Sequence, residues 1–277
     1  MVPYTRGPEY SRPFNQIIDE AKVLAEQGSR EIILLGQNVN AYEDDKLRLS
    51  DLILEIEKIK KIERIRYTTS HPRDMTDDLI DVYIHSNKLM PLIHLPVQSG
   101  SDKVLNLMNR KHSIKEYLKI VERLKKINQS IEFSSDFIIG YPGEEKKDFE
   151  KTINLVKEVG FINSYSFIFS PRPGTVAESY KLIRKEISLE RLEIIQKQLF
   201  ENQIIKNNSF ENEIIDVLVE NQTDDKLNLF GRSEYMTSVI MSGSTENIGQ
   251  LVKVKIHRSN RNSLFGEIVN DREKKVA

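Results

Sequence analysis

The chain has 277 residues and a formal net charge of -1, with 30% charged and 39% hydrophobic residues. This length fits one large and one small domain, and the balanced charge gives no global sign of a polyanionic partner, although it is compatible with a local basic face. No apolar stretch approaches the roughly 20 residues that cross a bilayer, and the opening residues lack a signal-peptide core. We therefore expect a cytoplasmic protein with no membrane partner.

Cysteine is absent from the sequence. The chain alone therefore has no thiolate for a disulfide, for nucleophilic catalysis or for an iron–sulfur cluster. Its five histidines, at positions 71, 85, 94, 112 and 257, show no paired spacing on a helix face. We therefore expect this chain to build no metal site, and we assign no catalytic side chain.

Residues 1–187 alternate strand-like apolar runs with helical patterns. Gly28 and Gly160 are expected to end helices, and four residues are expected to cap helix starts: Ser50, Thr76, Ser101 and Ser113, the last in a capping box with Glu116. The alternation is typical of right-handed βαβ units and predicts an α/β fold, a barrel of parallel strands with outer helices. Because the chain opens on a loop and a helix, we expect the barrel to be partial and to lack its first strand.

Five apolar runs end in polar or glycine-rich tips. In α/β barrels and open parallel sheets, ligands bind at the carboxyl ends of the strands, so these tips are expected to form the wall of one site. The alternative is that they are ordinary turns, since Gly, Pro, Asn and Ser are common wherever a strand ends. The tips are Gly36–Asn40, Ser70–Pro72, Gln98–Ser101, Gly140–Gly143 and Ser170–Gly174.

The pattern changes towards the end of the chain. A long polar helix that begins at Ser188 is expected to connect two domains over residues 188–210. Residues 211–272 contain five short alternating strands, expected at 214–219, 226–230, 235–241, 251–257 and 263–269, which is typical of a small closed barrel that binds nucleic acids. Its cations can bind RNA phosphates or form an ordinary solvated face: Arg232, Lys253, Lys255, Arg258 and Arg261.

Six motifs in order carry a family resemblance along nearly the whole chain. They are V-P-Y-T-R-G from Val2, G-Q-N-V-N-A-Y from Gly36, T-S-H-P-R-D from Thr69, H-L-P-V-Q-S-G-S-D from His94, D-F-I-I-G-Y-P-G-E from Asp136 and S-P-R-P-G-T from Ser170. With them the chain resembles the radical S-adenosylmethionine (SAM) methylthiotransferases, and within these the MiaB branch. The G-Q-N-V-N and T-S-H-P motifs argue against the threonylcarbamoyladenosine and ribosomal-protein branches. The final barrel resembles the TRAM domain, an RNA-binding module.

The resemblance implies a tRNA substrate and two cofactors, SAM and [4Fe–4S] clusters. In the family, a radical made from SAM abstracts hydrogen from C2 of N6-isopentenyladenosine next to the anticodon, and a methylthio group is added there. The residues that would line the SAM pocket are Gln37, Asn38, Ser70, Gln98 and Ser99. Packing alone poorly explains an amide followed by Ser-Gly-Ser at a strand end.

Four further candidates have open alternatives. Asp136 interrupts an apolar run, so it should be paired or hydrogen-bonded, either to the cofactor or to a neighbouring element. Arg6, Arg12 and Arg172 lie on expected loops at the mouth of the site. Their guanidinium groups suit tRNA phosphates or the SAM carboxylate, and the alternative is a solvated surface.

The family's C-x-x-x-C-x-x-C loop, whose thiolates hold the cluster, would precede Met1. We therefore expect the chain to be the C-terminal portion of such an enzyme, unable to bind a cluster by itself and inactive without a cysteine-bearing N-terminal half. A separate N-terminal chain is one source of that half. The alternatives are an RNA-binding fragment and a non-functional remnant of a split gene.

Overall fold

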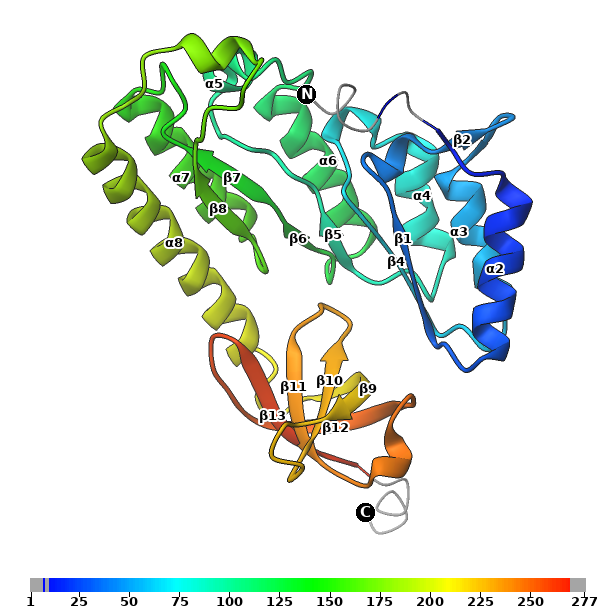
Figure 1. Ribbon diagram of the computed structural model, residues 1–277. Helices are drawn as coiled ribbons and strands as arrows, with labels where there is room; N and C mark the ends of the chain where they lie inside the picture. Colours follow the sequence, from blue (N-terminus) through cyan, green and yellow to red (C-terminus); the bar gives the residue numbers. More distant parts are fainter. Residues whose placement is uncertain (1–6, 8–9, 270–277) are drawn as a thin grey trace.

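The computed structural model describes Gly7 and residues 10–269. A half-barrel of α/β type is followed by one long helix and a small β-barrel (Figure 1). The first part and its helix comprise α2 (Phe14–Glu26), β1 (Glu31–Leu35), β2 (Glu43–Asp44), β3 (Leu47–Arg48), α3 (Leu49–Glu57), β4 (Arg64–Thr68), α4 (Asp77–His85), β5 (Leu92–His94), α5 (Asp102–Leu107), α6 (Ile114–Ile127), β6 (Glu132–Ser134), β7 (Asp136–Ile139), α7 (Lys146–Val159), β8 (Tyr165–Ile168) and α8 (Lys185–Asn208). None of the helices in the described part of the chain has the length and apolar character needed to cross a membrane.

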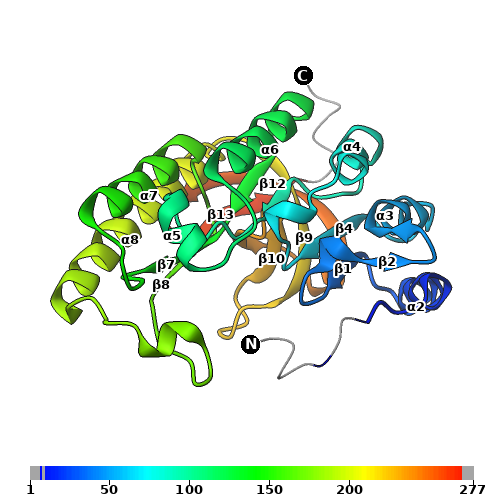
Figure 2. The ribbon, with the colours of Figure 1, turned by 90° about the horizontal axis from the view of Figure 1, so that it is seen from above.

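Parallel pairing joins the strands of the first part into one curved sheet. β1 pairs with β4, β5 with β6, and β7 with β8, all in parallel. Single bridges from Ile65 to Leu89 and from Gln98 to Phe137 connect these pairs. Seen from above, the strands form an open arc with α2, α3, α4, α6 and α7 on its outer side (Figure 2). The structure therefore confirms a partial barrel of parallel strands with outer helices.

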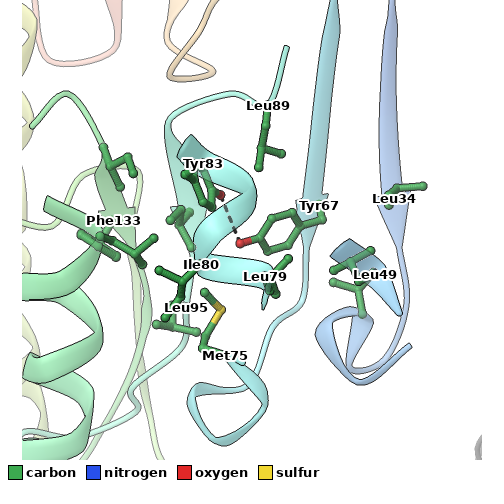
Figure 3. Packing of buried hydrophobic residues seen from close by; sticks show 14 of the residues in the cluster. Leu34, Leu49, Tyr67, Met75, Leu79, Ile80, Tyr83, Leu89, Leu95 and Phe133 are labelled. Atoms are coloured by element: carbon green, nitrogen blue, oxygen red, sulfur yellow. Dashed lines mark hydrogen bonds between the residues drawn. The ribbon is translucent and has the colours of Figure 1, made fainter. Parts of the chain in front are cut away.

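The core lies between the sheet and these helices. On β1, Ile32 and Leu34 are buried, whereas Leu35 on the opposite face is 72% exposed. Tyr67 of β4 lies in the same outer core, where its hydroxyl accepts a hydrogen bond of 3.1 Å from the hydroxyl of Tyr83 (Figure 3). Each large apolar side chain buried there contributes about 1.5–3 kcal/mol. This packing fixes the curvature of the sheet, and with it the positions of the strand ends.

Most helix ends follow the expected residues. Gly28 and Gly160 lie just beyond α2 and α7 with φ of +102° and +73°, a conformation that glycine adopts without strain. The Ser113 hydroxyl accepts from the Glu116 amide and completes the capping box of α6. Two other residues take the expected N-cap positions: Thr76 and Ser101.

Two serines that were expected to begin helices lie inside them. α3 already begins at Leu49, and the Ser50 hydroxyl donates to Asp78 at 2.6 Å. Ser188 lies within α8 and is buried against Gly140, where a Cβ atom would be 2.4 Å from the serine Oγ. Both side chains contact a neighbouring element instead of capping their own helix, which is why the sequence expectation was wrong.

The small barrel consists of β9 (Ile214–Gln222), β10 (Leu229–Ser233), β11 (Ser238–Ser242), β12 (Leu251–Ser259) and β13 (Ser263–Ile268), closed in the order β10-β11-β13-β12-β9. This confirms the expected small closed barrel. Gly231 and Gly266 permit the closure, because a Cβ atom there would lie 2.4 and 2.2 Å from carbonyl oxygens of facing strands. The strand expected at 235–241 begins only at Ser238, since Met236 has a φ of +60° and turns the chain.

The small barrel docks on the end of the half-barrel at which the parallel strands begin. Arg64 donates to one carbonyl oxygen of β9 and one of β10 at 2.7 and 2.8 Å. Arg66 donates to two carbonyl oxygens at the turn after β10, at 2.7 and 3.1 Å, and to Glu31 at 3.1 Å. In Figure 1 this turn reaches towards the lower ends of β4 and β5. Docking therefore closes one end of the half-barrel and leaves the carboxyl ends of the strands free.

Candidate functional site

The loops after β1 and β4 are tied together at the carboxyl end of the sheet. Asn40 exchanges two hydrogen bonds of 2.9 Å with the backbone of His71. Thr69 has a φ of +70°, a conformation that costs free energy for a β-branched residue. The sequence motifs after these strands therefore form one frame and are not independent turns.

This frame holds three of the expected cofactor ligands. The Asn38 amide nitrogen donates to Asp74 at 2.6 Å, while its Oδ1 atom is buried without a partner among the described residues. The Ser70 hydroxyl is likewise buried and unpaired in the described part of the chain. Gln37 is exposed. Because an unpaired buried polar atom costs about 1–3 kcal/mol, a polar ligand group beside Asn38 or Ser70 would be stabilising.

Gln98 and Asp136 lie side by side on neighbouring strands. The backbone N–H of Gln98 donates to the backbone carbonyl of Asp136, and the backbone carbonyl of Gln98 accepts from the backbone N–H of Ile138, both at 3.0 Å. Gln98 is 7% exposed and has a φ of +71°, a strained conformation that occurs frequently at functional sites. Asp136 is 33% exposed, and its Oδ2 atom lies 3.7 Å from Nε2 of His94. The expected partner of this carboxylate is therefore a histidine of β5.

Arg110 is a residue of this site that the sequence reasoning missed. Burial lowers the pKa of its guanidinium group, and the carboxylate of Asp136 opposes that shift. The Arg110 side chain forms no hydrogen bond or ion pair with another described residue. The sequence could have indicated it by position, because Arg110 comes just after α5, and α5 begins directly after the Gln98–Ser101 loop. A partly buried cation whose side chain makes no hydrogen bond or ion pair with a described residue is suited to bind an anionic group.

Two histidines border the same region. The rings of His71 and His112 form an edge-to-face pair with centroids 5.5 Å apart. Burial, the neighbouring His71 and Arg110 together lower the pKa of His112 to about 4, so the ring is neutral at physiological pH. Neither ring nitrogen of His112 meets hydrogen-bond geometry with a described residue, although the backbone of Val97 lies near enough to oppose the lowering of its pKa. Within those residues no group of three or more His, Asp or Glu side chains is arranged to hold a metal ion.

Ser99 points towards α7. Its hydroxyl lies 3.4 Å from that of Thr152 and accepts from the Ser101 amide at 3.2 Å. Gly100 lets the loop touch the helix, because a Cβ atom would lie 2.5 Å from the Cα of Thr152. Contrary to the sequence expectation, packing does explain the Ser-Gly-Ser segment. A contact from Ser99 to the cofactor stays a prediction.

The cations expected at the mouth of the site have different surroundings. Arg6 lies outside the described residues. Arg12 forms an ion pair with Glu20 at 2.6 Å, with both side chains half exposed. Arg172 is exposed in the loop after β8. The structure therefore places Arg12 and Arg172 on the surface and leaves their role in RNA binding a prediction.

The five expected cations of the small barrel divide into two groups. Arg232 and Arg261 line a cleft of about 380 Å³ between β8, α8 and the barrel. The other three lie on β12 outside this cleft: Lys253 paired with Asp216 at 3.0 Å, Lys255 exposed, and Arg258 over the ring of Phe265 at 4.3 Å. The cleft therefore holds two of these cations and the outer face of β12 the other three, and RNA binding by all five stays a prediction.

Comparison with known proteins identifies the class of this fold. The family model of the Radical SAM superfamily matches residues 1–156, and that of the TRAM domain matches residues 208–269. The chain therefore belongs to the radical SAM superfamily. Among solved structures, coproporphyrinogen III oxidase from Escherichia coli, a radical SAM enzyme, superimposes with a TM-score of 0.50 at 14% identity, over 91% of this chain and 63% of that chain, which supports the fold alone.

Within the superfamily, the chain is similar to proteins named tRNA-2-methylthio-N(6)-dimethylallyladenosine synthase. The one from Pelagibacter ubique (strain HTCC1062) is 65% identical over 281 residues, which are 100% of this chain and 63% of that protein. The one from Wolbachia pipientis subsp. Culex pipiens (strain wPip) is 49% identical over 273 residues, 96% of this chain and 62% of that protein. These relatives confirm the resemblance drawn from the six motifs. The chain spans less than two-thirds of their length.

Proposed function

We propose that the chain is the C-terminal portion of a tRNA methylthiotransferase, which adds a methylthio group to C2 of N6-isopentenyladenosine next to the anticodon. The names of the similar proteins and the TRAM domain support the reaction and the tRNA partner. The observation that carries the proposal is the meeting, inside a radical SAM half-barrel, of Gln98 after β5 with Asp136 at the start of β7 and with Arg110, whose pKa the Asp136 carboxylate affects. A cytoplasmic location, where tRNA is modified, follows from the same proposal.

The residues at the strand ends fit SAM. Arg110 offers a partly buried guanidinium group to the carboxylate of the methionine moiety, while Gln98 and Asp136 suit its amino group and the ribose hydroxyls. The unpaired atoms of Asn38 and Ser70 offer two further polar positions. When bound, SAM and a reduced cluster supply the hydrogen abstraction, and the residues of this chain bind and orient the cofactor.

A [4Fe–4S] cluster does not fit this chain, because the sequence contains no cysteine. We therefore infer that the chain is inactive until a cysteine-bearing segment completes it, either upstream in the same polypeptide or as a separate chain. No reaction step is assigned to a side chain described here. In the complete enzyme, this chain binds SAM and tRNA.

The test compares the chain alone with a fusion to the preceding segment of the Pelagibacter relative. After anaerobic reconstitution, the fusion should bind iron and sulfide, release 5′-deoxyadenosine from SAM and yield methylthio-isopentenyladenosine in tRNA, as detected by mass spectrometry. The chain alone should do none of these. A stoichiometric cluster on the chain alone, or a cluster-loaded fusion that cleaves SAM but leaves tRNA unmodified, contradicts the proposal.

A second candidate is an RNA-binding fragment without enzymatic activity. It is favoured by the closed β9–β13 barrel, which holds its own hydrophobic core and needs no cluster. In that case the chain binds tRNA, and the fusion adds neither SAM cleavage nor tRNA modification. The same pair of proteins therefore separates the two candidates.

A further inference from the structure

We propose that the cleft between β8, α8 and the small barrel binds an unpaired strand of the RNA substrate. Tyr165 and Phe200 stack on its bases, and Arg232 and Arg261 bind its phosphates. The proposal rests on the proposed function and assigns the surface that holds its RNA substrate.

Charge in the cleft favours an anionic ligand. Arg232 and Arg261 are the charged residues that line it, and none of the lining residues is Asp or Glu. The nearest carboxylate to Arg232 is that of Glu220, 3.7 Å away in β9 and outside the cleft lining. Both arginines are also pre-positioned: Arg232 donates to the Met236 carbonyl at 3.1 Å, and Arg261 lies 4.2 Å above the ring centre of Phe200.

Aromatic rings favour unpaired bases over other anions. Phe200 on α8 is 41% exposed and Tyr165 on β8 is 64% exposed, although both rings are large enough to fill a core. Tyr165 stacks on Phe167, which is 54% exposed, with ring planes at 18° and centroids 6.4 Å apart. Rings alternating with arginines are the usual platform for single-stranded nucleic acid, since every base has a π face. A duplex hides those faces in its own stack.

The cleft borders the strand that carries Asp136. Tyr165 is the direct partner of Asp136 in the parallel ladder, so the two side chains lie on the same face of the sheet. Asp136 in turn is hydrogen-bonded through its carbonyl to Gln98. Asp136 and Tyr165 both begin their strands, so the cleft borders the candidate cofactor site on the side of the small barrel. In Figure 1 the small barrel and the lower part of α8 flank this end of β8.

The experiment measures binding of a fluorescent single-stranded RNA heptamer to the 277-residue chain by anisotropy. Phe200→Ala and Tyr165→Ala should each weaken binding about fivefold to hundredfold, the loss expected for one base stack. Tyr10→Ala is the matched control, because Tyr10 is 79% exposed and lies outside the cleft lining. It should change affinity less than about twofold. Circular dichroism melting verifies that each variant is folded.

Three further comparisons identify the ligand. Arg261→Gln should lower the slope of log affinity against log salt by about 0.7, the value for one phosphate contact on a single strand. Duplex RNA and a polyglutamate peptide should compete at least tenfold less well than the heptamer.

The proposal is overturned if both aromatic variants bind like the parent, or if either competitor matches the heptamer. The assay needs neither SAM nor a cluster. A fusion that binds RNA through this cleft but modifies no tRNA therefore counts against the proposed function alone.

Discussion

The two ends of the half-barrel contain arginines that differ in burial and in their partners: Arg64 and Arg66 are buried, whereas Arg110 is partly buried. At the end covered by the small barrel, Arg64 and Arg66 donate to four backbone carbonyl oxygens and to Glu31. At the other end, Arg110 is partly buried, and its side chain has no hydrogen bond or ion pair within the described residues. A buried guanidinium group must recover its lost hydration from some partner. Arg64 and Arg66 recover it from carbonyl oxygens and Glu31 and so hold the small barrel against the half-barrel, an arrangement we call the structural clamp. Arg110 has no such partner among the described residues, and we expect it to bind a ligand.

Substitution of Arg64 by Met tests the clamp and should have the largest effect. Methionine keeps much of the side-chain volume but leaves two carbonyl oxygens of β9 and β10 without donors. The free energy of unfolding in urea should fall by about 3 kcal/mol or more. Arg30→Met is the control, because Arg30 is 37% exposed and its loss should cost less than about 1 kcal/mol. Equal costs for the two variants would remove the distinction between a buried clamp and a surface cation.

Arg110→Gln tests the opposite end and should affect ligand binding more than folding. In the cysteine-bearing fusion, SAM affinity measured by calorimetry should fall by about 2 kcal/mol, or roughly thirtyfold, because a charge-assisted contact to the carboxylate is lost. The free energy of unfolding should change by less than about 1 kcal/mol, since no described partner is left unpaired. A large loss of stability with unchanged SAM affinity would make Arg110 a structural residue like Arg64.

The contrast between these ends could be predicted only in part from the sequence. The parallel half-barrel, the closed barrel and the neighbouring positions of Gln98 and Asp136 follow from apolar periodicity and from the polar tips, which are local features. Arg64 and Arg66 alternate with apolar residues, a pattern that normally indicates one solvated face. Their burial depends on contacts up to 168 residues away, which no local pattern contains.

The binding surfaces likewise could be predicted only in part from the sequence. The cations of the small barrel looked equivalent in the sequence, yet Arg232 and Arg261 face α8 and β8 while the others lie on β12. Phe200 of α8 lies beside Arg261 only because the barrel docks there, a contact that no local pattern predicts. Arg110 was missed for a similar reason, because its lack of a hydrogen-bonded or ion-paired partner appears only once the strand ends are assembled.

At the ligand-binding end, His112 should make the free energy of unfolding depend on pH. Its folded pKa of about 4 lies below the value of about 6.5 for an unfolded chain, so the unfolded state takes up the proton first as the pH falls. Stability due to the neutral ring is therefore complete above pH 6.5 and is lost progressively between pH 6.5 and 4, by at most about 3 kcal/mol. His112→Gln should flatten this part of the profile in denaturation experiments. Arg110→Gln should flatten it partially, since Arg110 helps to lower the pKa of His112. Parallel profiles for the parent and His112→Gln would contradict the prediction.

The smallest expected change in stability comes from backbone strain at Gln98. It shows whether the strained residue serves ligand binding or is only a structural turn. Its φ of +71° suits glycine, so Gln98→Gly should be about 1 kcal/mol more stable than Gln98→Ala, which keeps the strain. Both variants lack the side-chain amide, so both fusions should lose about 1 to 3 kcal/mol of SAM affinity. The pair therefore measures strain and ligand contact independently, by urea unfolding and by calorimetry. If the glycine variant keeps the parent's SAM affinity, the amide of Gln98 does not contact the cofactor, and the strained backbone serves only to join β5 to β7.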